Sequence, residues 1–160
     1  MGTAKTFRKI LQRKLYKTKL SRNDSLTLIL HELKKIANLN SCLLTDENGF
    51  AMAQVLNPLD DKENLSATTA LIKGNADRID DYIKTGTINT SYFVSNNIMI
   101  WVIPIKIPNC NESFILFVSK KNSVLERMSK STLRLLGKQK INIYPLLEIA
   151  ITFISNLCKA

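Results

Sequence analysis

The chain has 160 residues, enough for one domain with a sizeable core and too few for two ordinary domains with a linker. A hydrophobic fraction of 45% argues against an intrinsically disordered chain, and no stretch has the length and apolarity of a membrane span or secretory signal. The three cysteines form no CxxC pair, which argues against a disulfide framework or a zinc site and favours reduced thiols in the cytoplasm.

The net charge of +10 is unevenly distributed along the chain. Residues 1–22 carry eight Lys or Arg and no Asp or Glu, and residues 120–140 carry seven basic side chains against one acidic one. Residues 23–119 are mildly acidic, with seven basic and eleven acidic side chains. The basicity therefore belongs to an N-terminal extension, 1–22, and to an insertion, 120–140, within a single domain that spans 23–158.

Two helices are expected first. In residues 1–22 the apolar side chains recur at helical spacing among lysines and arginines, which predicts a basic amphipathic helix with Phe7, Ile10, Leu11 and Leu15 on its apolar face. After the capping residues Ser21–Asp24, a second helix is expected whose core face consists of Leu26, Ile29, Leu30, Leu33, Ile36 and Ala37.

A hairpin and a long helix follow. Residues 40–46 and 50–56 are expected to form two strands, joined at a turn where Asn48-Gly49 favours the positive φ of tight hairpins. Residues 62–84 predict a long helix whose inner face consists of Leu65, Thr69, Ile72, Ala76, Ile79 and Ile83.

Three further strands are expected at 87–95, 98–105 and 113–119, with turns at Asn96-Asn97 and after Pro108. A basic helix is expected over 123–137, and Pro145 begins the final helix. The order α-β-β-α-β-β-β-α, preceded by the basic helix, predicts an α+β sandwich with helices on both faces of a five-stranded antiparallel sheet.

The sequence offers little for catalysis. Its one histidine, His31, lies within a predicted core helix, so we expect a structural or surface residue there. No phosphate-binding loop, dinucleotide fingerprint or metal-binding motif is present. Asp46, Asp60, Asp61 and Glu63 fall in turns or at a helix start, where carboxylates favour the local geometry. We therefore expect a protein that is not an enzyme, with no cofactor and no metal.

The run from Leu26 to Lys120 resembles the Roadblock/dynein light chain family, which is related to profilin-like and longin-type sandwiches. A Leu-rich helix leads into a strand that ends in Leu43-Leu44-Thr45-Asp46, and the D-x-x-G hairpin continues through Glu47-Asn48-Gly49-Phe50. A helix rich in small residues and the three-stranded meander come next. The basic extension and the basic insertion depart from the family pattern, so the resemblance implies nothing about them.

The resemblance implies pairing with a second copy or with another Roadblock-like chain. In such dimers the second helices of the domain pack together and the third strands meet. The corresponding interface residues here would be Ser66, Ala70, Lys73, Gly74, Asp77, Ile88, Thr90 and Tyr92. The spacing of the small residues also allows close approach to the sheet of the same chain. A third strand at an edge, without Pro or Lys, would independently favour extension of the sheet by a partner.

The resemblance also implies a function, namely a platform that binds or regulates a Ras-like small GTPase. The alternative is a structural adaptor subunit of a motor or membrane-associated complex.

Three interpretations remain open for the basic patch of residues 1–22, which consists of Lys5, Arg8, Lys9, Arg13, Lys14 and Lys17. The helix could be docked or solvated; it could lie in an anionic membrane surface with its apolar face inserted, aided by a myristoyl group on Gly2; or it could bind nucleic acid. Binding to nucleic acid is the least favoured of the three interpretations, since few aromatic residues accompany the charges. The expected location is the cytoplasm, with membrane association as the open alternative.

Overall fold

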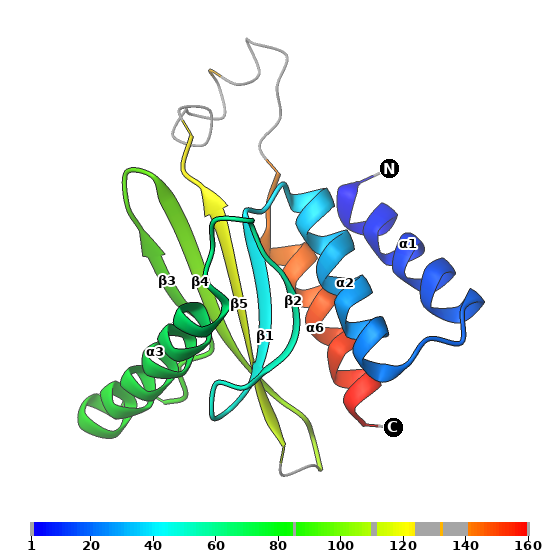
Figure 1. Ribbon diagram of the computed structural model, residues 1–160. Helices are drawn as coiled ribbons and strands as arrows, with labels where there is room; N and C mark the ends of the chain where they lie inside the picture. Colours follow the sequence, from blue (N-terminus) through cyan, green and yellow to red (C-terminus); the bar gives the residue numbers. More distant parts are fainter. Residues whose placement is uncertain (1, 85, 110–111, 124–131, 133–140, 160) are drawn as a thin grey trace.

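The structure is a computed structural model that describes residues 2–84, 86–109, 112–123, 132 and 141–159 (Figure 1). Within these ranges the helices and strands are α1 (Thr3–Lys17), α2 (Arg22–Ala37), β1 (Ser41–Asp46), β2 (Ala51–Val55), α3 (Lys62–Ile83), β3 (Ser91–Val94), β4 (Ile98–Lys106), β5 (Ser113–Lys121) and α6 (Tyr144–Cys158). The predicted order of helix, hairpin, helix, meander and helix, preceded by an N-terminal helix, is confirmed.

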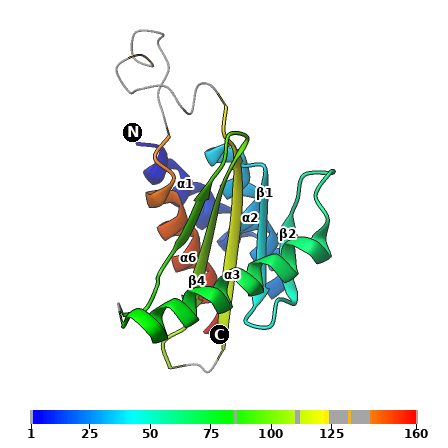
Figure 2. The same cartoon turned by 90° about the vertical axis from the view of Figure 1, so that its left-hand side faces the viewer.

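The five strands form one antiparallel sheet in the order β2-β1-β5-β4-β3. Helices α2 and α6 cover one face of it, and among the described helices α3 alone lies across the other (Figures 1 and 2). The interior strands β1 and β5 are buried almost throughout because both faces of the sheet are covered there. The predicted α+β sandwich with helices on both faces is therefore confirmed.

Two apolar clusters fill the sandwich, one on each face of the sheet. The larger lies against α2 and α6, and the smaller lies under α3 and contains Leu43, Val102, Ile115 and Phe117. Successive residues of a strand point to opposite faces, so Leu44 belongs to the larger cluster and its neighbour Leu43 to the smaller one. Most of the core therefore lies on the α2–α6 side.

Helix α2 has the N-terminal cap and the buried face that the sequence predicts. The hydroxyl of Ser21 accepts a hydrogen bond from the backbone N–H of Asp24 at 3.1 Å, which caps the first turn. The predicted core face is buried except for Ile36, which is half-buried.

Helix α1 is docked on α2 and α6 through its apolar face (Figure 1). Phe7 and Leu11 are 0% exposed and belong to the larger cluster, and Ala4 and Leu15 pack against it. The open alternative of an apolar face inserted in a membrane does not fit Phe7 and Leu11, because both side chains are buried in the core. The arrangement of α1 in the structure is therefore that of the docked helix, the first of the three interpretations of this segment.

The β1–β2 hairpin depends on Asp46 and Gly49. The Asp46 carboxylate accepts hydrogen bonds from the backbone N–H groups of Asn48 and Phe50 at 2.9 and 2.8 Å. Gly49 has φ +89°, and a Cβ at this position would lie 3.1 Å from the Cβ of Ala70 and from the backbone oxygen of Ser66. The hairpin therefore requires glycine both for its turn and for its contact with α3.

Two predicted segments differ from the structure. The third strand was expected over 87–95, but β3 spans Ser91–Val94. Pairing of β3 starts at Ser91 with Val102, so a longer strand would place Asn89 opposite Pro104, which has no backbone N–H to donate. The expected insertion begins later than residue 120, because Lys120 and Lys121 belong to β5. The helix expected over 123–137 falls almost entirely on residues outside the described ranges.

Candidate functional site

An exposed apolar surface lies where α3 passes the edge of the sheet. It consists of Ile79, Tyr82 and Ile83 from α3 and of Phe93 from β3, and we call it the α3–β3 surface. The α3 side chains are 47%, 86% and 65% exposed, respectively. Clustered apolar exposure of this kind marks interaction sites more often than single exposed apolar side chains do.

The overhang of α3 explains why this surface is exposed. Helix α3 crosses the sheet obliquely, and its C-terminal end projects beyond β3 (Figures 1 and 2). Thr69 and Ala76 on its inner face are buried against the sheet. Ile79 and Ile83 continue the same face of the helix, but the prediction that they are core residues is wrong, because the sheet ends before it reaches them.

Strand β3 is the terminal strand on the same side of the sheet. It pairs with β4 from Ser91–Val102 to Val94–Met99, and the ring of Tyr92 packs on that of Trp101 with centroids 5.0 Å apart. The sequence Ser-Tyr-Phe-Val contains no lysine or proline, the residues that commonly block pairing at an edge. The strand is therefore open to extension by another chain.

The small residues of α3 divide into two groups. Ser66 is buried and Ala70 half-buried beneath Gly49, so these two residues contact the hairpin of their own chain. Gly74 is exposed, and a Cβ there would meet no atom within 4 Å. Lys73 and Asp77 form an ion pair along the outer side of the helix.

The remaining residues expected at an interface lie near β3. Tyr92 is in the strand and partly exposed, whereas Ile88 and Thr90 precede it. The interface residues expected from the sequence did not include Ile79, Tyr82, Ile83 or Phe93. An excess of large apolar side chains at the end of the α3 sequence was the signal available for the first three.

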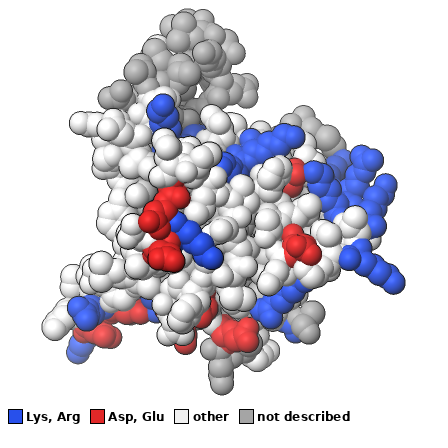
Figure 3. All heavy atoms as spheres, in the orientation of Figure 1, with Lys and Arg blue, Asp and Glu red and all other residues white. Residues whose placement is uncertain are grey.

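The basic patch lies on the opposite side of the molecule, on α1 (Figure 3). Lys14 reaches α2, where its Nζ lies 2.5 Å from Oε1 of the buried Glu32. Burial opposes ionisation of Glu32, but the hydrogen bond and charge of Lys14 outweigh it and hold the pKa of Glu32 below its ordinary value. Lys5, Arg8, Lys9, Arg13 and Lys17 are exposed and form no ion pair with any described residue.

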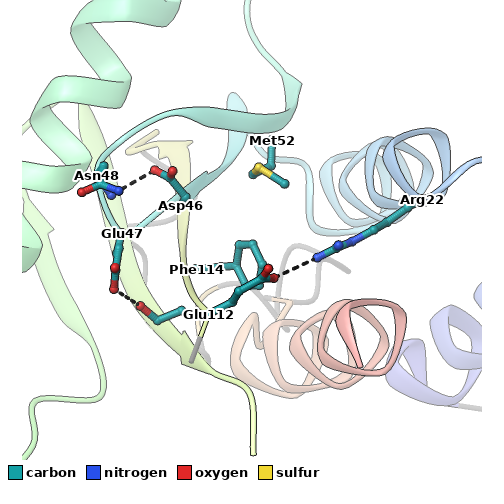
Figure 4. A pocket seen from close by; sticks show the side chains of 8 residues that line it. Arg22, Asp46, Glu47, Asn48, Met52, Glu112 and Phe114 are labelled. Carbon is teal, nitrogen blue, oxygen red and sulfur yellow. Dashed lines mark hydrogen bonds and ion pairs between the residues drawn. The ribbon is translucent and has the colours of Figure 1, made fainter. Parts of the chain in front are cut away.

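A polar cleft of about 280 Å³ lies beside the hairpin (Figure 4). Its carboxylates already have partners within the chain. Glu112 lies 3.4 Å from the guanidinium of Arg22, Ser113 donates a hydrogen bond to Glu47 at 2.8 Å, and Asp46 caps the turn. These contacts stabilise the local fold. They leave no pair of carboxylates among the described lining residues poised for acid–base chemistry.

The other reactive groups lie apart from one another. His31 is on the outer surface of α2, and burial raises the pKa of the Cys42 thiol to about 12, which keeps it protonated. Within the described ranges, no group of three His, Cys, Asp or Glu side chains could hold a metal ion. None of the described helices combines the length and apolarity needed to cross a membrane.

Comparison with known proteins identifies the fold. No protein-family model and no curated protein matches the sequence. Among solved structures, Myxococcus xanthus MglB is similar at 15% identity and a TM-score of 0.65, over 89% of this chain and 93% of that one. A structure titled "MglB with tetrameric arrangement" is similar at 12% identity and a TM-score of 0.62, over 89% and 93%.

A Roadblock/LC7 domain from Streptomyces avermitilis is similar at 10% identity and a TM-score of 0.57, over 82% of this chain and 97% of that one. The chain therefore has the Roadblock fold, and the resemblance stated from the sequence is confirmed at the level of the fold. Identities of 10–15% carry no information about individual residues.

Proposed function

We propose that the chain is a dimerising Roadblock-type platform that binds and regulates a Ras-like small GTPase. The observation that carries the proposal is the α3–β3 surface, where the unfilled inner face of a helix lies beside an open strand edge. The resemblance to the Roadblock/dynein light chain family supplies the class of partner, since its members serve as platforms for such GTPases.

A second copy of the chain fits the α3–β3 surface. Antiparallel pairing of two β3 strands would satisfy the backbone groups at both edges and continue the sheet across the dimer. The same two-fold operation would bring both α3 helices together, so that Ile79 and Ile83 of each copy gain apolar neighbours. One of the similar solved structures is titled "MglB with tetrameric arrangement", which supports self-association by proteins of this fold.

The contribution of Ile83 to the dimer follows from its exposure. Complete burial of an isoleucine side chain contributes about 1.5–3 kcal/mol. Ile83 is 65% exposed, so burying the remainder contributes about 1–2 kcal/mol per copy and about 2–4 kcal/mol per symmetric dimer. Loss of that contribution weakens the dimer by a factor of roughly 30 to 1,000.

The first test replaces Ile83 with lysine. A lysine at the last residue of α3 interacts favourably with the helix dipole, so the Ile83→Lys monomer should remain folded. The matched control is Leu59→Lys, because Leu59 is 94% exposed and precedes the other end of α3. Sedimentation velocity should show a weakened dimer for Ile83→Lys and an unchanged one for Leu59→Lys. Equal association of both variants contradicts the proposed interface.

The second test concerns the GTPase. Purified Ras-like GTPases, loaded with GDP or with a non-hydrolysable GTP analogue, are mixed with the chain and with Ile83→Lys. We expect a complex that favours one nucleotide state, a changed rate of GTP hydrolysis, and loss of both with the variant. A stable dimer that binds none of the GTPases and leaves every rate unchanged removes the GTPase from the proposal and leaves a structural adaptor.

A further inference from the structure

The outer side of α1 carries a row of positive charge. Lys5, Lys9 and Arg13 follow one another at intervals of four residues, and the largely exposed Tyr16 continues the row. Successive residues turn by 100°, which places these four side chains opposite the buried Phe7 and Leu11. We call the four residues the α1 stripe; it spans about 17 Å along the helix axis.

The α1 stripe does not help the helix that carries it. Like charges four residues apart repel one another, and no acidic side chain occurs anywhere in α1 to offset them. Lys5 also lies in the first turn, where the helix dipole favours negative charge. Lys14 shows what a structural basic residue does in this helix, since it pairs with the buried Glu32. The three basic side chains of the α1 stripe form no such pair with a described residue.

We propose that the α1 stripe binds the anionic lipid headgroups of a membrane surface while the apolar face of α1 remains docked in the core. A plane of headgroups can contact all three charges at once, because they lie on the same outward side of the helix. The exposed ring of Tyr16 has the amphipathic character of aromatic residues that lie at headgroup level. A base-stacking site would require more aromatic side chains than this single tyrosine.

This mode of binding differs from insertion of an amphipathic helix. Phe7 and Leu11 stay within the protein, so attraction is mainly electrostatic, reversible and sensitive to salt. Helix α1 and the α3–β3 surface lie on opposite sides of the sheet (Figure 1), so the membrane contact leaves the latter free. The inference is therefore independent of the proposed dimer and GTPase.

The test uses charge removal in the full chain, because deleting residues 1–22 would also remove two core side chains. The test variant is Lys5→Gln/Lys9→Gln/Arg13→Gln, and the matched control is Lys62→Gln/Lys106→Gln/Lys159→Gln, which removes three exposed charges elsewhere. Binding is measured by sedimentation with phosphatidylcholine vesicles, with and without phosphatidylserine, at about 0.1 M and about 1 M salt, where the Debye length is about 10 Å and about 3 Å.

We expect the wild-type chain to bind only phosphatidylserine vesicles and only at the lower salt concentration. Each basic residue near an anionic surface contributes roughly fivefold to binding, so the test variant should bind roughly 100-fold more weakly and the control nearly as well as wild type. Three outcomes would overturn the inference: no binding by the wild-type chain, equal loss in test variant and control, or tighter binding to duplex DNA than to the vesicles.

Discussion

The replacement of Phe7 by alanine tests whether α1 is an integral part of the domain. Phe7 is completely buried in the larger cluster, and truncation of such a side chain to alanine costs about 3–5 kcal/mol. Domains of this kind have unfolding free energies of about 5–15 kcal/mol, so a large share of the stability should be lost. The midpoint of thermal unfolding should fall by roughly 6–20 °C.

Urea unfolding followed by far-ultraviolet circular dichroism measures this effect. Alanine favours helix formation more than phenylalanine does, so a loss of stability must come from packing rather than from helix propensity. Tyr16→Ala is the matched control, because it also removes an aromatic ring from α1 but at a position that is 87% exposed. The control should change the unfolding free energy by less than about 0.5 kcal/mol. A cost below about 1 kcal/mol for Phe7→Ala would refute the docking of α1.

Three further substitutions test other parts of the structure by urea unfolding. Because the pKa of Glu32 is lowered in the folded chain, its charge contributes stability above the unfolded pKa of about 4.3, and that stability is lost as the pH falls through the folded value. Glu32→Gln should therefore lose less stability than wild type between about pH 6 and pH 3, and parallel pH profiles would contradict this. Gly49→Ala should cost more than about 1 kcal/mol, because its φ is positive and the added Cβ meets α3; an unchanged unfolding free energy would contradict the hairpin contact. Gly74→Ala, made in the Ile83→Lys chain, should raise the unfolding free energy by about 0.5–1 kcal/mol, because the site is helical and open; a decrease would show that the position is not open in the monomer.

Local signals in the sequence were sufficient for the central elements. The capping residue Ser21 and the apolar periodicity after it define α2, and the positive φ favoured by Asn48-Gly49 marks the hairpin. These features depend only on residues a few positions apart, so they can be recognised without knowledge of the tertiary structure. The order of strands and helices followed from them.

The candidate site was harder to predict because it depends on where distant elements end. Ile79 and Ile83 have the spacing of core residues, and only the width of the sheet places them beyond its edge. Strand β3 is shorter than its β-rich sequence indicates because its partner strand contains Pro104. The location of Phe7 and Leu11 could not be predicted for the same reason. The spacing of apolar residues along a helix is the same whether that face packs on other helices or on lipid.

The solution mass of the purified chain, measured by light scattering over a range of concentrations, tests the proposed platform most directly. Because the α3–β3 surface is apolar, we expect a dimer that persists at about 1 M salt, and Ile83→Lys should shift the mass toward that of the monomer. A monomer at every concentration, or a dimer that Ile83→Lys leaves unchanged, would contradict pairing through the α3–β3 surface.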